Sequence, residues 1–126
     1  MNTEPPGDDG SDLGEVIRFD VVDHGPTARV LHVVGELDTL TAPLLAVRLA
    51  EQQAAVPKLV VDLSEVSFLG SAGLAALVEA KDAADRDGSR LLVVPGSRIV
   101  KRALEATGLL SLFTVADDVP EALGAR

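Results

Sequence analysis

The sequence predicts a single α/β domain in which a mixed, mostly parallel sheet of four to five strands is covered by about four helices. Segments with the pattern of strands alternate along the chain with segments of helical spacing. Two strand-like runs, 58–63 and 90–95, are continuously apolar, which is typical of strands buried on both faces. The length of 126 residues fits one domain of common size.

The N-terminal part of the chain predicts a tail, a hairpin and a helix. Residues 1–14 are rich in Pro, Gly, Asp and Ser, so we expect a flexible acidic tail before a domain over 15–126. VIRFDVVD and ARVLHVVG (28–35) are predicted strands joined by a short turn. The helix that follows, within 39–55, has Thr39 or Thr41 near its N-cap and Pro43 in its first turn.

The C-terminal part continues the alternation of strands and helices. After the strand at 58–63, a long helix is predicted over 71–87, with Gly88 as its C-cap residue. The remaining predicted elements are the strand 90–95, a helix over 97–108, a short strand over 112–115 and a last helix over 117–125.

Composition excludes several function classes. The net charge of −9 and the 2% of aromatic residues disfavour direct nucleic-acid binding, because phosphate would be repelled and bases would find no stacking surface. Cysteine is absent, so there is no disulfide and no thiolate metal site. No apolar run approaches the ~20 residues that span a bilayer. We therefore expect a cytoplasmic protein without membrane insertion, cofactor or metal.

The stretch FLGSAGLAAL raises the question of what Ser71 does at the start of a helix. A nucleophile elbow, G-x-S-x-G, is not present because Leu69 stands where its first Gly should be. No phosphate-binding glycine loop is present either. The simplest interpretation is that the Ser71 hydroxyl caps the helix. Such a position also tolerates negative charge, so Ser71 could accept a phosphate without loss of the fold.

The helix over 71–87 predicts two different faces. A stripe of mostly small residues should pack on the sheet: Gly73, Leu77, Ala80 and Ala84. The opposite face is predicted to be exposed and to consist of Ser71, Ala72, Ala75, Ala76 and Glu79. A face with so few long side chains lets another protein approach closely, although alanine is also simply a good helix former.

The segment GELD places Glu36 and Asp38 directly after a predicted strand. The plain interpretation is an acidic turn that caps the helix following it. Nothing near these carboxylates in the sequence forms a catalytic acid–base pair with them.

Two stretches, VVGELDTLTAPLL (33–45) and LVVDLSEVSFLGSAGLAALVEA (59–80), resemble the STAS domain family, in particular the bacterial anti-sigma factor antagonists. The family pattern has a GELD segment after a strand and later a D-L-x-x-V-x-F-x-D-S-x-G-L segment. Both occur here in the same order, and the resemblance covers about residues 15–126.

The resemblance implies a function without catalysis. Such proteins bind a kinase-type anti-sigma factor and free a sigma factor; the kinase phosphorylates the motif serine, and a phosphatase reverses this. By position that serine is Ser71. The resemblance places Glu36 and Asp38 near the partner-binding surface, together with the residues around Ser71: Gly70, Ala72, Ala75, Ala76 and Glu79. Homodimer formation is left open.

One position departs from the family pattern. The residue before the serine is commonly Asp, and here it is Gly70. This departure concerns phosphorylation more than the fold. The alternative function is therefore a STAS scaffold that is not phosphorylated, or a cytoplasmic subunit of a lipid or anion transport system.

Overall fold

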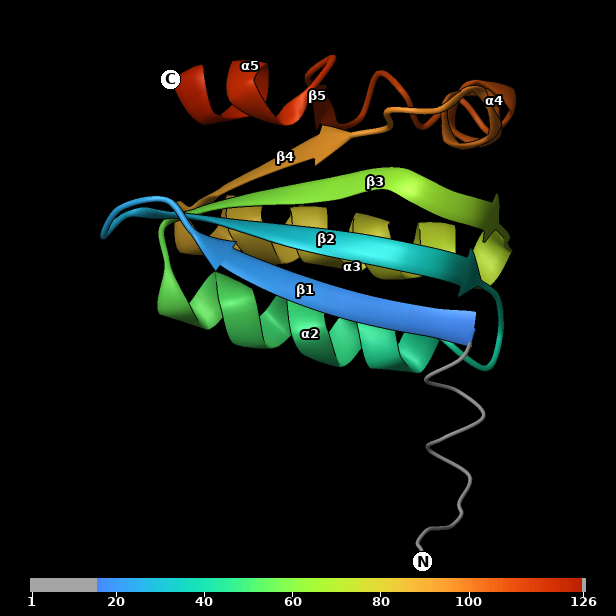
Figure 1. Ribbon diagram of the computed structural model, residues 1–126, viewed down its shortest axis with the longest axis horizontal. Coiled ribbons are helices and arrows are strands. Elements are labelled where there is room, and N and C mark those ends of the chain that lie inside the picture. Colours follow the sequence, from blue (N-terminus) through green and yellow to red (C-terminus); the bar gives the residue numbers. More distant parts are fainter. Residues whose placement is uncertain (1–15, 126) are drawn as a thin grey trace, which may run out of the picture.

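The strands form one five-stranded sheet in the order β1-β2-β3-β4-β5 in the computed structural model, which describes residues 16–125 (Figure 1). β1 and β2 are antiparallel, and all other neighbours are parallel, which confirms the predicted mixed sheet. The strands are β1 (Ile17–Asp23), β2 (Ala28–Leu37), β3 (Lys58–Leu69), β4 (Arg90–Val94) and β5 (Thr114–Val115). The helices are α2 (Ala42–Ala55), α3 (Ser71–Asp87), α4 (Arg98–Ala106) and α5 (Val119–Gly124).

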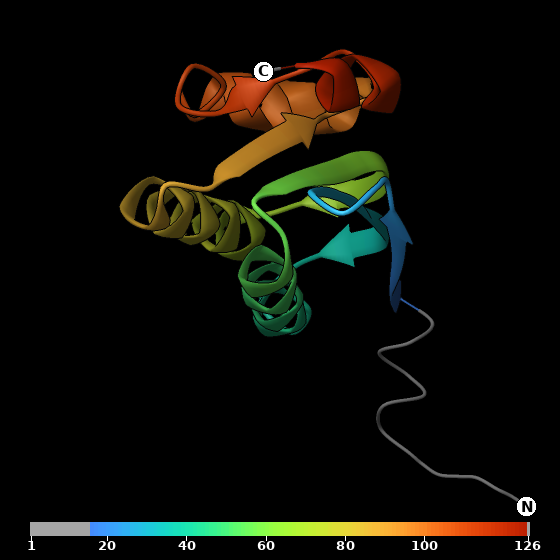
Figure 2. The ribbon, with the colours of Figure 1, turned by 90° about the vertical axis from the view of Figure 1, so that its left-hand side faces the viewer.

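Helices cover the two faces of the sheet unequally. In Figure 2, α2 and α3 lie side by side on one face, and α5 lies toward the β4 end of the molecule. The larger apolar core joins the sheet to α2, α3 and α4, with Leu31, Leu77 and Leu104 all fully buried. The smaller core, on the opposite face, packs Ala122 of α5 against Val60 and Leu92. The sheet is therefore enclosed most completely at β3 and β4.

The central strands confirm the expectation from their apolar runs, and β3 is longer than predicted. Val60 and Val61 point to opposite faces, and both are completely buried. β3 continues past the predicted end at residue 63 to Leu69, where it still pairs with Leu37 of β2. In this extension only Val66 and Leu69 are buried, each after two exposed residues, because the pairing with β2 shifts register there and breaks the regular alternation of a strand.

Most helix ends follow the predicted signals, and Thr41 is the N-cap residue of α2 with Pro43 in its first turn. Gly88 ends α3 in the left-handed conformation, with φ of 72°, as predicted. Ser97 caps α4 by accepting a hydrogen bond from the Val100 N–H. On α2, Leu45 and Leu49 are buried, whereas Leu44 and Val47 are exposed because one side of α2 faces away from the sheet.

The structure describes residues 16–125, which limits what it says of the predicted tail. The predicted tail, residues 1–14, lies outside the described residues, and the domain boundary at residue 15 stays a prediction. Within residues 16–125, no helix combines the length and the apolar character needed to cross a bilayer.

Candidate functional site

Ser71 is the first residue of α3, and its side chain is exposed at the carboxyl end of β3. The prediction that its hydroxyl caps the helix is wrong. The N-cap residue is Gly70, whose extended backbone lets its carbonyl oxygen accept the Leu74 N–H at 3.1 Å, so the helix begins after it. The Ser71 hydroxyl makes no hydrogen bond to any described residue and is presented to the surroundings.

The two glycines of GSAG, Gly70 and Gly73, let the first turn of α3 lie close to the ends of β2 and β3. A Cβ on Gly73 would lie 2.9 Å from side-chain carbons of Leu37 and Leu69, so only glycine lets the first turn of α3 approach β2 and β3 this closely. The Gly70 N–H donates a 2.9 Å hydrogen bond to the Leu37 carbonyl oxygen. This bond joins the end of β2 to the start of α3.

The GELD turn is built by hydrogen bonds around Asp38 and Thr41. The Asp38 carboxylate accepts the backbone N–H groups of Leu40 and Thr41, each at 3.0 Å. The completely buried Thr41 hydroxyl donates to the Glu36 carbonyl oxygen at 2.7 Å. The Thr41 backbone hydrogen bond is the main cause that lowers the pKa of Asp38 below its ordinary value. Asp38 therefore shapes the turn at the helix start, whereas the Glu36 side chain is exposed.

The predicted faces of α3 are confirmed except at Ala72 and Ala76. The predicted stripe is buried, and Leu74 lies with it: Gly73, Leu77, Ala80 and Ala84. Ala75 and Glu79 are exposed, and Ala72 is half-buried. The expectation that Ala76 is exposed is wrong, because it is only 9% accessible and faces the groove between α2 and α3. The buried arc of α3 is wider than predicted because the helix packs on α2 as well as on the sheet.

A groove runs along the exposed face of α3 from Ser71. Its volume is about 470 Å³, and its far wall comes from the segment after α4, through Thr107 and Leu109. Ala75, Val78 and Glu79 line it on the α3 side. The groove is shallow and open, so it offers a surface for a partner rather than an enclosed substrate site.

Two exposed apolar side chains near Ser71 were not predicted from the sequence. Phe68 is 50% exposed at the end of β3, and Leu40 is 71% exposed in the turn after β2. A Cβ on Gly70 would lie 3.0 Å from the Phe68 ring, so the ring sits directly beside the residue that precedes Ser71. Nothing in the sequence indicated this exposure, because large apolar residues near the ends of strands usually point into the core.

The histidines do not assemble a catalytic group with Ser71. His32 Nδ1 lies 2.7 Å from the Asp62 carboxylate, and both side chains are on the sheet face opposite α3. Asp62 also accepts the Ser64 N–H at 3.0 Å, and both residues lie within β3. No group of three or more metal-ligating side chains occurs in the described part of the chain.

Comparison with known proteins finds a matching family model and a related sequence. The family model described as the STAS domain matches residues 19–122. The anti-sigma-F factor antagonist RsfB of Mycobacterium tuberculosis is 35% identical over 108 residues, which is 85% of this chain and 87% of that protein.

Solved structures agree with this fold. The crystal structure of an anti-sigma factor antagonist from Mycobacterium paratuberculosis is 31% identical, with a TM-score of 0.74 over 86% of this chain and 92% of that one. The structure of the anti-sigma factor antagonist SpoIIAA in its unphosphorylated form is 19% identical, with a TM-score of 0.69 over 84% of this chain and 93% of that one. At this identity the likeness supports the fold alone. From its sequence motifs, its fold and these matches, this chain belongs to the STAS domain family.

Proposed function

We propose that this chain is an anti-sigma factor antagonist, which binds a kinase-type anti-sigma factor and thereby frees a sigma factor. Phosphorylation of Ser71 by that partner switches the binding off, and a phosphatase restores it. The observation that carries this proposal is the Ser71 hydroxyl, which is exposed and free of hydrogen bonds to described residues at the start of α3. The names of the relatives at 35% and 31% identity support the same function.

The surface around Ser71 has the composition of a docking site. Phe68 and Leu40 supply exposed apolar area at the end of the sheet. Ala75 and Glu79 continue this surface along α3. Ala75 contributes a small side chain and Glu79 a negative charge. Interfaces are commonly built this way, with apolar anchors in the centre and a polar rim. Glu36 and Asp38 lie at the neighbouring turn and complete the proposed surface with Gly70 and Ala72.

The switch follows from the charge of a phosphate. A phosphoserine adds about −1.5 to −2 charges at neutral pH. At the first position of α3 this charge lies near the N-terminal end of the helix dipole, so the fold tolerates it. A partner docked over Ser71 must instead desolvate the charge. An unpaired charge in an interface costs several kcal/mol, which corresponds to a loss of affinity of about a hundredfold or more.

The chain is proposed to act as a regulator in the cytoplasm and to carry no catalytic activity of its own. Gly70 stands where the family commonly has Asp, and a Cβ at this position would lie only 3.0 Å from the Phe68 ring. The kinase partner must therefore orient the Ser71 hydroxyl without help from a carboxylate at position 70.

Incubation with the anti-sigma factor kinase and ATP, followed by mass spectrometry, tests this proposal. One phosphate is expected, on Ser71. Ser71→Glu should lose binding to the kinase, and Ser71→Ala should bind and resist release by ATP. Phosphate on Ser64, Ser67 or Thr39 instead, or no phosphate, would support the scaffold or transport function.

A further inference from the structure

A second pocket lies at the carboxyl ends of β4 and β5, and it shares no lining residue with the groove at Ser71. Its volume of about 450 Å³ falls in the range of small-molecule sites. In open α/β sheets, ligands commonly bind outside the carboxyl ends of the strands. Its walls come from the β4–α4 turn, α4, the segment before β5, and β5 with the turn after it: Pro95, Gly96, Ser97, Arg98, Lys101, Leu110, Val115, Ala116 and Asp117.

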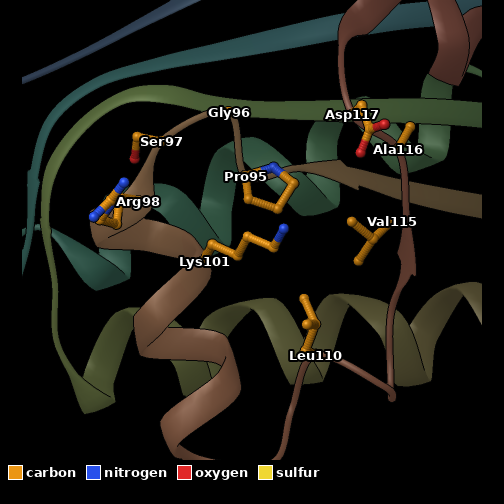
Figure 3. A pocket seen from close by; sticks show the side chains of 9 residues that line it. All are labelled: Pro95, Gly96, Ser97, Arg98, Lys101, Leu110, Val115, Ala116 and Asp117. Carbon is orange, nitrogen blue, oxygen red and sulfur yellow. The ribbon is translucent and has the colours of Figure 1, made fainter.

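One side of the pocket is basic. Arg98 and Lys101 both lie on α4, and Figure 3 shows Lys101 extending into the space between Pro95, Val115 and Leu110. Within residues 16–125, neither side chain forms an ion pair. Among the other basic side chains of the described residues, Arg18, Arg29, Arg48 and Lys81 pair with carboxylates, whereas Lys58, Arg86, Arg90 and Arg102 form no ion pair. Neither cation forms an ion pair with Asp117, which lines the same pocket, so an anionic group placed beside α4 would be stabilised by them.

The wall between the charged groups is aliphatic. Pro95, Leu110, Val115 and Ala116 line it, and no aromatic ring is among the lining residues. Such a wall suits a short hydrocarbon chain and offers no surface on which a nucleobase could stack.

Asp117 stands across the pocket from α4 (Figure 3). Its carboxylate forms no ion pair with a described residue. A ligand with a second negative charge at this end would be repelled, whereas a ligand with one negative charge would place its uncharged end here. The charges that line the pocket therefore suit a monocarboxylate better than a dicarboxylate.

We propose that this pocket binds a small aliphatic monocarboxylate. Arg98 and Lys101 hold the carboxylate, the wall around Val115 and Leu110 packs on the hydrocarbon chain, and Asp117 excludes a second carboxylate. This site is independent of the switch at Ser71, so it stands whether or not the proposed function is correct.

Titration of the full-length protein with 4-methylpentanoate, followed by calorimetry and backbone amide NMR, tests the site. A ligand of this size should bind with a Kd around the millimolar range, with shifts concentrated at Gly96, Ser97 and Val115. Adipate should bind several-fold more weakly, and Asp117→Asn should remove this difference. Lys101→Gln should weaken 4-methylpentanoate about tenfold.

The matched control is Arg102→Gln, which removes an exposed cation from the same helix outside the pocket and should leave binding unchanged. Circular dichroism and thermal melting establish that each variant is folded. The proposal is overturned if 4-methylpentanoate produces no localised shifts, if Arg102→Gln weakens it as much as Lys101→Gln does, or if inorganic phosphate binds equally well. The last result would mean that the aliphatic wall takes no part in binding.

Discussion

The backbone N–H of Gly70 donates a 2.9 Å hydrogen bond to the carbonyl oxygen of Leu37. This bond brings together the two sequence motifs, because Leu37 belongs to the GELD segment and Gly70 directly precedes Ser71. The turn after β2 and the start of α3 therefore form one continuous surface at the end of the sheet. A partner that docks at Ser71 meets both motifs at once.

Leu77 anchors α3 in the core, since it is completely buried. Leu77→Ala should lower the free energy of unfolding by about 2–5 kcal/mol, because truncation removes buried apolar area and leaves a cavity. Denaturant unfolding measures this loss. Ala75→Ser, on the exposed face of the same helix, should change stability by less than about 0.5 kcal/mol. Equal effects of the two substitutions would contradict the orientation of α3.

Ala75 and Ala76 provide a matched pair for the docking surface. Ala76→Arg should destabilise the protein by about 1–3 kcal/mol or more, because Ala76 is buried between α3 and α2. Ala75→Arg should leave the melting temperature nearly unchanged and abolish binding of the anti-sigma factor, because it adds bulk only to the exposed face. If Ala75→Arg binds normally, this face of α3 takes no part in docking.

Phe68 is expected to be a main apolar contact for the partner. Phe68→Ala should reduce partner affinity about tenfold or more, as for an aromatic side chain that becomes buried on binding. Stability should fall much less than for a core phenylalanine, since half of the side chain is exposed in the free protein. Titration calorimetry and denaturant unfolding separate the two effects. A loss of several kcal/mol in stability would indicate a core role instead.

Asp38 should contribute to stability against acid. Its pKa lies below the ordinary value of 3.8, mainly because its carboxylate accepts the Thr41 N–H. A carboxyl group with a lowered pKa in the folded state stabilises fully above its unfolded pKa, and this contribution disappears as pH falls through the folded pKa. The free energy of unfolding of the wild type should therefore fall more steeply below about pH 5 than that of Asp38→Asn. Parallel pH profiles from urea unfolding would show that Asp38 is not coupled to folding.

The order and type of the elements were predictable because each depends on local pattern. The continuous apolar runs that became β3 and β4 are buried on both faces, and the Gly88 signal ends α3 where it was expected. The motif that contains Ser71 was also visible in the sequence. These features are encoded by side-chain periodicity and backbone preference within a few residues.

Other features arise only when distant segments meet. Ala76 is buried because α2 packs against α3, and no periodicity within α3 reveals that neighbour. The exposure of Phe68 depends on where helices stop covering β3. Lys101 and Asp117 line the same pocket only because β4 pairs with β5 and so brings the segments that follow these strands together. By itself, the sequence determined the α/β pattern and the motif serine, because both are local. The tertiary structure alone decided which side chains are left exposed around Ser71 and which charges share a pocket, because burial and proximity are properties of packed elements.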